Sequence, residues 1–435
     1  MPTVIKIVFA VTLGTLLATG TLIALALARR KQRERRFREI DELWRLSFPV
    51  ISAMAGGAVD YQSAVQALRE VFRSGPDQAL VAERVLFGSR NPANISLPLL
   101  RQLAVDFGLV QLWERRVLGW PEPLSWRAAV SHPESALERI GPLSFLLRAR
   151  GAEHLGLIRH APSWRVLVQA LDDPHSEVRS AAARALGAIA EPRSFATLTE
   201  RLQAVVVSSS TSLSVRHLKA ALVAFPLRLG RHLAGLLEHT HPRVRFLAAD
   251  VVREMVERAA EAEEDWVLRR AHFSPELTEL FLTRLVFDEN PDVRARAGPV
   301  ISRLDDSRAA LRLVMLLDDT QWFVRLHAVR ALAQRRFVTL AEHVTRCLTD
   351  VHWRVREAAV RTLLSLGPAG VGRLLGHFLA TQDRYSLEQI AEELQRPGRL
   401  PVLLGEHGHD GDGLKMQVIE RLARMGKSNG LPSAL

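Results

Sequence analysis

The sequence predicts an all-α protein, an α-solenoid of two-helix repeats that is preceded by one transmembrane helix. Three observations lead to this fold class. A run of 22 residues without a charged side chain lies near the start, a basic segment follows it, and a Val-Arg dipeptide recurs between residues 178 and 356. Apolar residues make up 48% of the 435 residues, which is enough to build a core and excludes a disordered chain.

The charge-free run covers residues 7–28. A helix of that length covers about 33 Å, which matches the hydrocarbon core of a bilayer. We therefore expect a transmembrane signal-anchor helix over residues 4–28. Within it Ala10, Gly14 and Ala18 place small side chains on one helix face, a pattern that favours a homodimer packed through the transmembrane helix.

A basic juxtamembrane segment, residues 29–38, follows the run directly. It contains one acid, Glu34, and seven basic residues, which are Arg29, Arg30, Lys31, Arg33, Arg35, Arg36 and Arg38. Because positive residues stay on the cytoplasmic side, we expect the N-terminus outside and the remaining chain in the cytoplasm, at a bacterial inner membrane. These seven side chains are expected at the membrane surface, against anionic lipid head groups.

The alternative for this region is a cleaved signal peptide. Ala26-Leu27-Ala28 has the small-x-small form of a cleavage site, and cleavage there would give an exported or periplasmic protein. That interpretation requires a positive segment before the run, where only Lys6 is present. It also places seven basic residues just after the cut, where they would oppose export, so the uncleaved anchor is favoured.

The rest of the chain is close to electrically balanced. The net charge of the protein is +11, but residues 39–435 contain 50 basic and 46 acidic side chains. The charge therefore describes a short segment and not a nucleic-acid-binding body. A single cysteine, Cys347, excludes a disulfide framework and a cysteine-rich zinc site.

The repeat signal is carried by Val-Arg dipeptides, and the last two steps between their arginines have the same length. The arginines are Arg179, Arg216, Arg245, Arg294, Arg325 and Arg356. A step of that same length back from the first of them reaches Arg148, where the surrounding residues also align. We therefore predict at least seven units in a repeat array over residues 145–382.

Each clear unit has the same three parts. A first helix carries apolar residues such as Leu167 and Leu171, and a polar turn contains Asp173 and Pro174. A second helix then carries small residues, with alanine at 181–183 and 185. One such pair cannot bury its apolar face alone, so the units must stack into a continuous solenoid.

Less repetitive helical segments flank the array, as capping of its open ends requires. Residues 39–144 are expected to form a helical N-terminal cap region, and residues 383–435 a degenerate C-terminal cap and tail. The helices predicted in these flanks cover residues 37–54, 58–73, 77–87, 96–118 and 414–425.

The units resemble HEAT repeats, specifically the short bacterial type that is also found in phycobilisome-lyase-like proteins. The resemblance rests on the pattern L-x-D-x-x-x-x-V-R-x-x-A-x-x-A-L. It implies a structural ladder between adjacent repeats, formed by turn aspartates and by the arginines that follow each of them after six residues: Asp173, Arg179, Asp288, Arg294, Asp319, Arg325, Asp350 and Arg356. The units of Arg148, Arg216 and Arg245 carry Pro142, Ser210 and His239 instead of the acid, so we expect the ladder to be interrupted there.

Trp322 and Trp353 are the candidate partner contacts. They lie one repeat apart, each three residues before its ladder arginine, so a solenoid brings them to one edge. Tryptophan dominates the energetic centres of protein interfaces. Packing that closes the repeat turn explains the same pattern, and stacking of a planar ligand between the two indoles is a third interpretation.

No catalytic, cofactor or metal site is predicted. The sequence has no glycine-rich phosphate loop, no nucleophile elbow and no suitably spaced pair of catalytic acids. The segment EHGHDGDG (406–413) matches no zinc or calcium motif.

The predicted function is that of a membrane-anchored cytoplasmic scaffold which binds another protein, such as a membrane enzyme or its regulator, and which is not an enzyme. Neither a cofactor nor a nucleic acid is an expected partner. Two alternatives stay open, an exported binding protein and, from the family resemblance, a lyase-like enzyme acting on a planar ligand.

Overall fold

The described residues form helices and no strand. The computed structural model describes residues 2–72, 78–87, 95–120, 144–208, 213–262, 273–335, 338–396 and 411–425. The chain divides into two compact units, Met1–Ile189 and Ala190–Leu435. This division falls inside the expected array of residues 145–382, so the helices that carry Arg148 and Arg179 are grouped with the N-terminal helices.

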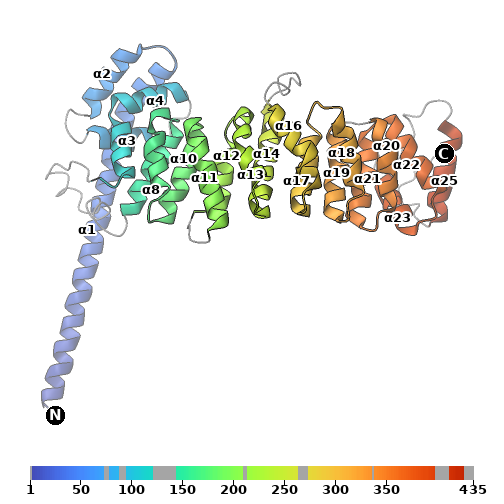
Figure 1. Ribbon diagram of the computed structural model, residues 1–435. Coiled ribbons are helices and arrows are strands. Elements are labelled where there is room, and N and C mark those ends of the chain that lie inside the picture. Colours follow the sequence, from blue (N-terminus) through green and yellow to red (C-terminus); the bar gives the residue numbers. More distant parts are fainter. Residues whose placement is uncertain are drawn as a thin grey trace. The chain divides into compact units, whose positions relative to one another are not determined.

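The first unit packs α8 between α5 and α10. Trp113 of α5 and Leu155 of α8 are fully buried there. In chain order (Figure 1) the helices of this unit are α1 (Pro2–Ala55), α2 (Tyr61–Phe72), α3 (Gln78–Phe87), α4 (Leu97–Asp106), α5 (Leu109–Val117), α8 (Ser144–Leu157), η1 (Ala161–Ser163), α9 (Trp164–Ala170) and α10 (Ser176–Ile189).

The first helix, α1, is 54 residues long and uninterrupted (Figure 1). It contains the charge-free run, the basic segment and, as its last part, the helix predicted over residues 37–54. Its C-terminal end packs against α2 and α3, and Ile51 and Met54 are buried there. The first part of the predicted cap region therefore continues the N-terminal helix without a break.

The expected transmembrane segment lies partly outside the described residues. The side chains of residues 7–13, and those of Arg29, Arg33, Arg35 and Arg36, are not described. Leu16, Ile23 and Leu27 are described and are 71%, 56% and 59% exposed. Arg30, Lys31 and Arg38 are exposed as well. In the described residues, no helix combines the length and the apolar character needed to cross a membrane.

The helix expected over residues 96–118 is two helices, α4 and α5. Gly108 separates them and has a φ of +68°, in the left-handed region. Glycine adopts this conformation without the steric cost of a Cβ atom, so the chain turns here instead of continuing the helix. The apolar spacing continues across the turn, which is why the sequence pattern predicted a single helix.

The second unit is two layers of helices. Second helices pack in series, α12 on α14, α14 on α17, α17 on α19, α19 on α21 and α21 on α23, and first helices α16, α18, α20 and α22 pack in the other layer. The elements of this unit (Figure 1) are α11 (Arg193–Val207), α12 (Val215–Val223), η2 (Leu227–Leu233), α13 (Ala234–Leu237), α14 (Pro242–Ala262), α16 (Pro275–Thr283), η3 (Leu285–Phe287), α17 (Pro291–Ile301), α18 (Arg308–Leu317), α19 (Trp322–Arg335), η4 (Val338–Leu340), α20 (Ala341–Arg346), η5 (Cys347–Thr349), α21 (Trp353–Ser365), α22 (Pro368–Ala380), α23 (Arg384–Leu394) and α25 (Gly411–Arg424).

Small residues let the second helices approach one another closely. Ala328 of α19 and Ala359 of α21 are fully buried, and leucines such as Leu313 of α18 fill the layer of first helices. At the C-terminal end α25 packs on α22 and buries Val418 and Leu422. The last helix thus covers apolar surface that the final repeat would otherwise expose to water.

Two glycines of α22 test this packing with the same substitution. A Cβ atom on Gly370 would lie 2.1 Å from the carbonyl oxygen of Leu363, whereas nothing lies within 4 Å of one on Gly376. We expect Gly370→Ala to lower the free energy of unfolding by about 1–3 kcal/mol, because α21 and α22 must move apart. Gly376→Ala should raise it by up to about 1 kcal/mol, because alanine favours the helix. Denaturant unfolding of both variants measures the difference, and equal effects would contradict the packing described.

Candidate functional site

Arginine–aspartate pairs connect consecutive repeats. Arg325 Nε donates to Asp350 Oδ2 at 2.6 Å, and its Nη2 donates to Oδ1 at 2.8 Å. Arg294 binds Asp319 in the same way, at 2.7 and 2.9 Å. In each pair the arginine begins a second helix and the aspartate belongs to the turn of the next repeat. This two-bond geometry matches the planar fork of a guanidinium to the two oxygens of a carboxylate.

The remaining donor of each ladder arginine closes its own turn. Arg325 Nη1 donates to the carbonyl oxygens of Asp319 at 2.8 Å and Thr320 at 3.2 Å. Corresponding bonds are made by Arg179, Arg245, Arg294 and Arg356. One guanidinium therefore fixes the turn of its own repeat and the position of the next one.

The turn aspartates have a second role as caps. The Oδ1 atoms of Asp319 and Asp350 accept the backbone N–H of the residue two positions later, at 2.9 and 2.8 Å. Burial would raise the pKa of Asp319, but the hydrogen bonds and charge of Arg294 outweigh it and hold the pKa below its ordinary value. Asp319 is thus ionised, and both of its carboxylate oxygens accept hydrogen bonds from Arg294.

The ladder is not interrupted in the way we expected. Arg148 binds Asp173 at 2.7 and 3.0 Å, and Arg245 binds Asp288 at 2.6 and 2.8 Å. The prediction was wrong because the arginine pairs with the turn that follows it, so a missing acid removes the partner of the preceding arginine. His239 replaces the acid before Arg245 and keeps only the capping role, since its Nδ1 accepts the N–H of His241 at 3.0 Å. Pro142 and Ser210 lie outside the described residues.

Trp322 and Trp353 lie on one edge but do not stack on each other. The ring of His352 stacks on Trp322, with centroids 3.8 Å apart and an angle of 3°, and Trp353 lies on the other side, 6.3 Å from His352. The guanidinium carbon of Arg354 lies 5.7 Å from the Trp322 ring and 5.3 Å from the Trp353 ring. We call these four residues the aromatic edge. The ring that stacks closely on Trp322 is thus that of His352 and not the indole of Trp353.

Stacking of an aromatic ring on a histidine occurs in two places in the repeats. Phe145 stacks on His175 in the first unit, with centroids 3.5 Å apart and an angle of 12°. In both stacks the ring three residues before one ladder arginine packs on the histidine four residues before the next. Trp322 thus packs in the turn, while Trp353, which has no described histidine beyond it in the row, is 51% exposed beside Val351, which is 96% exposed.

His352 and Arg354 were missed by the sequence interpretation. A histidine or asparagine four residues before a ladder arginine caps the second helix in several repeats: its side chain accepts a backbone N–H in His175, His241, Asn290 and His352. Aligning the turns on their arginines would have revealed this position. The aromatic stacking on it depends on the distance between repeats, which the spacing alone does not give.

A buried ionic cluster was also missed. Asp250 of α14 is 5% exposed and binds Lys219 of α12, Arg253 of α14 and Arg296 of α17, the last at 2.7 Å. Burial opposes ionisation of Asp250, but these cations lower its pKa. Burial, with Arg296 and Arg330 nearby, lowers the pKa of His327 to about 4. The signal was an acid inside an apolar stretch, FLAADVV, at the centre of a second helix.

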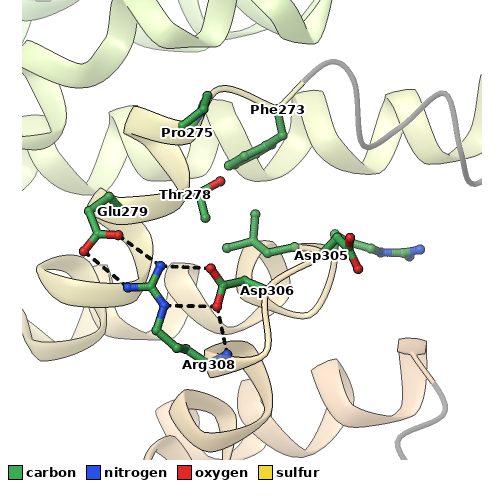
Figure 2. Close-up of a pocket in the computed structure, with 9 residues that line it drawn as sticks. Phe273, Pro275, Thr278, Glu279, Asp305, Asp306 and Arg308 are labelled. Carbon is green, nitrogen blue, oxygen red and sulfur yellow. Dashed lines mark hydrogen bonds and ion pairs between the residues drawn. The ribbon is translucent and has the colours of Figure 1, made fainter.

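A cavity of about 360 Å³ lies beside α16 and the connection from α17 to α18 (Figure 2). Phe273 and Thr278 line one side of it and Asp305 the other. Arg308 lies between two carboxylates, 3.0 Å from Glu279 and 2.9 Å from Asp306. Both acids therefore share one arginine. In the described part of the chain, no group of three His, Cys, Asp or Glu side chains could hold a metal ion. The segment 406–410 lies outside the described residues.

The profile of the HEAT repeats family matches residues 136–208, 274–364 and 313–395 of this chain. Residues 136–208 and 274–395 are therefore HEAT repeats. The matched segments include every ladder pair described above except that of Arg245 with Asp288, and they include the whole aromatic edge. HEAT repeats generally mediate protein–protein contacts.

Solved structures similar to this HEAT-repeat chain include three of low identity. An engineered protein is 16% identical, with a TM-score of 0.32 over 88% of this chain and 99% of its own. Human deoxyhypusine hydroxylase in complex with glycerol is 17% identical, with a TM-score of 0.24 over 69% and 96%. The Escherichia coli protein YibA is 17% identical, with a TM-score of 0.29 over 67% and 97%. No curated protein matches the chain significantly.

Proposed function

We propose that this HEAT-repeat protein is a scaffold that binds another protein through the aromatic edge. The observation that carries the proposal is the exposure of Trp353, of which 51% is accessible although its neighbours are fixed. His352 is held by its stack on Trp322 and by the hydrogen bond from its N–H to Asp350. A large aromatic side chain on such a rigid support buries much area at a small loss of conformational entropy.

The edge also offers charge beside apolar surface. Val351 is almost fully exposed, and Arg354 lies over both indole rings. Exposed tryptophan next to arginine is the combination that dominates the centres of protein interfaces. We propose no catalytic role for the aromatic edge, because its four residues include no hydroxyl or thiol nucleophile.

The test is capture of the partner by full-length protein from its own cells, quantified by mass spectrometry for each variant. Trp353→Ala should reduce recovery of the partner at least about tenfold, as truncation of an interface centre does. Trp120→Ala is the matched control, because Trp120 is 60% exposed in the first unit and distant in sequence from the edge. Circular dichroism should be unchanged in both variants.

Two outcomes of that measurement would contradict the proposal. Recovery of the partner by Trp353→Ala at the wild-type level would show that the edge does not bind it. Equal losses in Trp353→Ala and Trp120→Ala would show that the effect is not specific to the edge.

We further propose that the N-terminal part of α1 anchors the scaffold in a membrane, with the repeats on the cytoplasmic side. The proposal is supported by the absence of charge from 7–28, by the basic residues after it, and by the exposure of Leu16, Ile23 and Leu27. Exposed apolar side chains along several turns of helix are unfavourable in water. An anchor would confine the scaffold and a membrane partner to two dimensions, which raises their effective concentration.

Extraction of membranes at alkaline pH tests the anchor. The full-length protein should stay in the pellet with an intact N-terminus by mass. Leu16→Arg together with Ile23→Arg should release it, because each charge at the centre of a span costs roughly 2.5–3.5 kcal/mol. Leu46→Arg, at a residue that is 56% exposed in the same helix beyond the basic segment, should not. Release of the wild-type protein would overturn the anchor, and a mass beginning at residue 29 would establish export with cleavage.

A further inference from the structure

At Arg356 the ladder meets a turn that offers it no aspartate. Arg356 closes its own turn as the other ladder arginines do, with Nη1 donating to Asp350 O at 2.8 Å and Val351 O at 3.2 Å. Its side chain is only 9% exposed, yet its buried Nε has no hydrogen-bond partner among the described residues. In the two repeats directly before it, the Nε atoms of Arg294 and Arg325 donate to a carboxylate at 2.7 and 2.6 Å. A buried donor without an acceptor is costly, and the cost falls when an acceptor binds.

The reason lies in the turn that follows. Thr381 occupies there the position that Asp350 occupies one repeat earlier, and its Oγ1 accepts the N–H of Asp383 at 3.2 Å. Thr381 therefore caps the turn as the aspartates do, but it has no carboxylate that could bind Arg356. The nearby acid is used elsewhere, since Asp383 Oδ1 accepts the N–H of Ser386 at 2.6 Å as the cap of α23.

The aromatic stack ends at the same place. Trp353 is the ring that would pack on a side chain at position 383, where the other stacks have His175 and His352, but that position is an aspartate. Instead, the ring of Tyr385 lies over the guanidinium carbon of Arg356 at 5.4 Å, and Tyr385 is 65% exposed. Within the described residues, one repeat thus has two unfilled positions, one for a carboxylate and one for a planar side chain.

We propose that a partner protein fills both positions with an Asp-x-planar segment, in which an aspartate binds Arg356 and a histidine or aromatic ring two residues later packs on Trp353. The proposal rests on the scaffold function above and names the chemistry of its partner. The template is within the chain, because Asp350 and His352 make these two contacts with Arg325 and Trp322. The exposed ring of Tyr385 turns aside to admit the carboxylate, a movement that surface side chains make in nanoseconds.

The guanidinium of Arg356 can bind a carboxylate through two parallel hydrogen bonds, as Arg294 and Arg325 do. Two carbonyl oxygens hold Nη1, so the Nε–Nη2 side of the fork is presented in one orientation. That side matches two coplanar oxygens. The neighbouring exposed ring of Trp353 favours a carboxylate that is carried by a peptide over a free ion, because a peptide can also place a ring on Trp353.

The test uses the acetylated, amidated peptide Thr-Asp-Val-His, which copies residues 349–352, and its binding to the full-length protein measured by NMR titration. The peptide should bind at least about tenfold more tightly than Thr-Asn-Val-His, which loses the charge-assisted pair. Thr-Asp-Val-Ala should bind more weakly than Thr-Asp-Val-His, because it loses the ring contact. Equal binding of the aspartate and asparagine peptides, or displacement of the peptide by millimolar phosphate or acetate, would overturn the proposal.

Thr381→Asp tests the same site from inside the chain. The new carboxylate should occupy Arg356, raise the unfolding midpoint relative to Thr381→Asn, and abolish peptide binding. Thr381→Asn is the matched control, since asparagine keeps the cap without the charge. An unchanged midpoint together with intact peptide binding in Thr381→Asp would show that Arg356 is closed to a carboxylate.

These results are distinguishable from failure of the scaffold function. If Thr381→Asp still captures the cellular partner while Trp353→Ala does not, the scaffold stands and the Asp-x-planar segment is wrong. If neither variant affects capture, both proposals fall.

Discussion

The contact between an arginine of one repeat and the turn aspartate of the next fixes the spacing on which the second unit depends. Arg294 and Arg325 each bind one carboxylate through two donors and their own turn through a third. The acids are 8% exposed, so desolvation offsets much of the attraction, and the net gain in stability is smaller than the geometry suggests. What the pairs determine is register, because a repeat displaced along its neighbour would leave a buried charge without a partner.

The alignment of neighbouring repeat turns also determines which side chains meet on the surface of the solenoid. Capping histidines follow Arg148 and Arg325 along the chain, and at His175 and His352 an aromatic ring of the preceding repeat packs on the histidine. The same spacing that builds the core therefore arranges rings in a row on one edge. Where the row and the ladder both stop, at Trp353 and Arg356, the surface is apolar, cationic and rigid.

The repeat architecture could be predicted from the sequence, because Val-Arg spacing and alanine-rich second helices reflect local packing needs. The direction of the ladder could not, since the aspartate near each arginine in sequence is not its partner, which belongs to the following turn. The break at Gly108 was missed because the apolar spacing continues through it, although only a φ of +68° distinguishes a turn from a helix there. Of the candidate site, Trp322 and Trp353 were identified from the sequence. The role of His352 and the cluster around Asp250 were not, because they depend on contacts between helices that periodicity does not encode. The expected transmembrane helix stays a prediction.

A double-mutant cycle on Arg325→Gln and Asp350→Asn, read by native-state hydrogen exchange of the α19 and α21 amides, tests the role of the ladder most directly. Hydrogen exchange suits a repeat protein because it reports the opening of single repeats. The account predicts a coupling free energy of about 1–3 kcal/mol for this pair. The exposed pair Arg373 with Glu342, at 3.4 Å, is the reference and should give less than about 1 kcal/mol. A coupling for Arg325 with Asp350 no larger than that of the exposed pair would contradict the claim that the ladder holds neighbouring repeats in register.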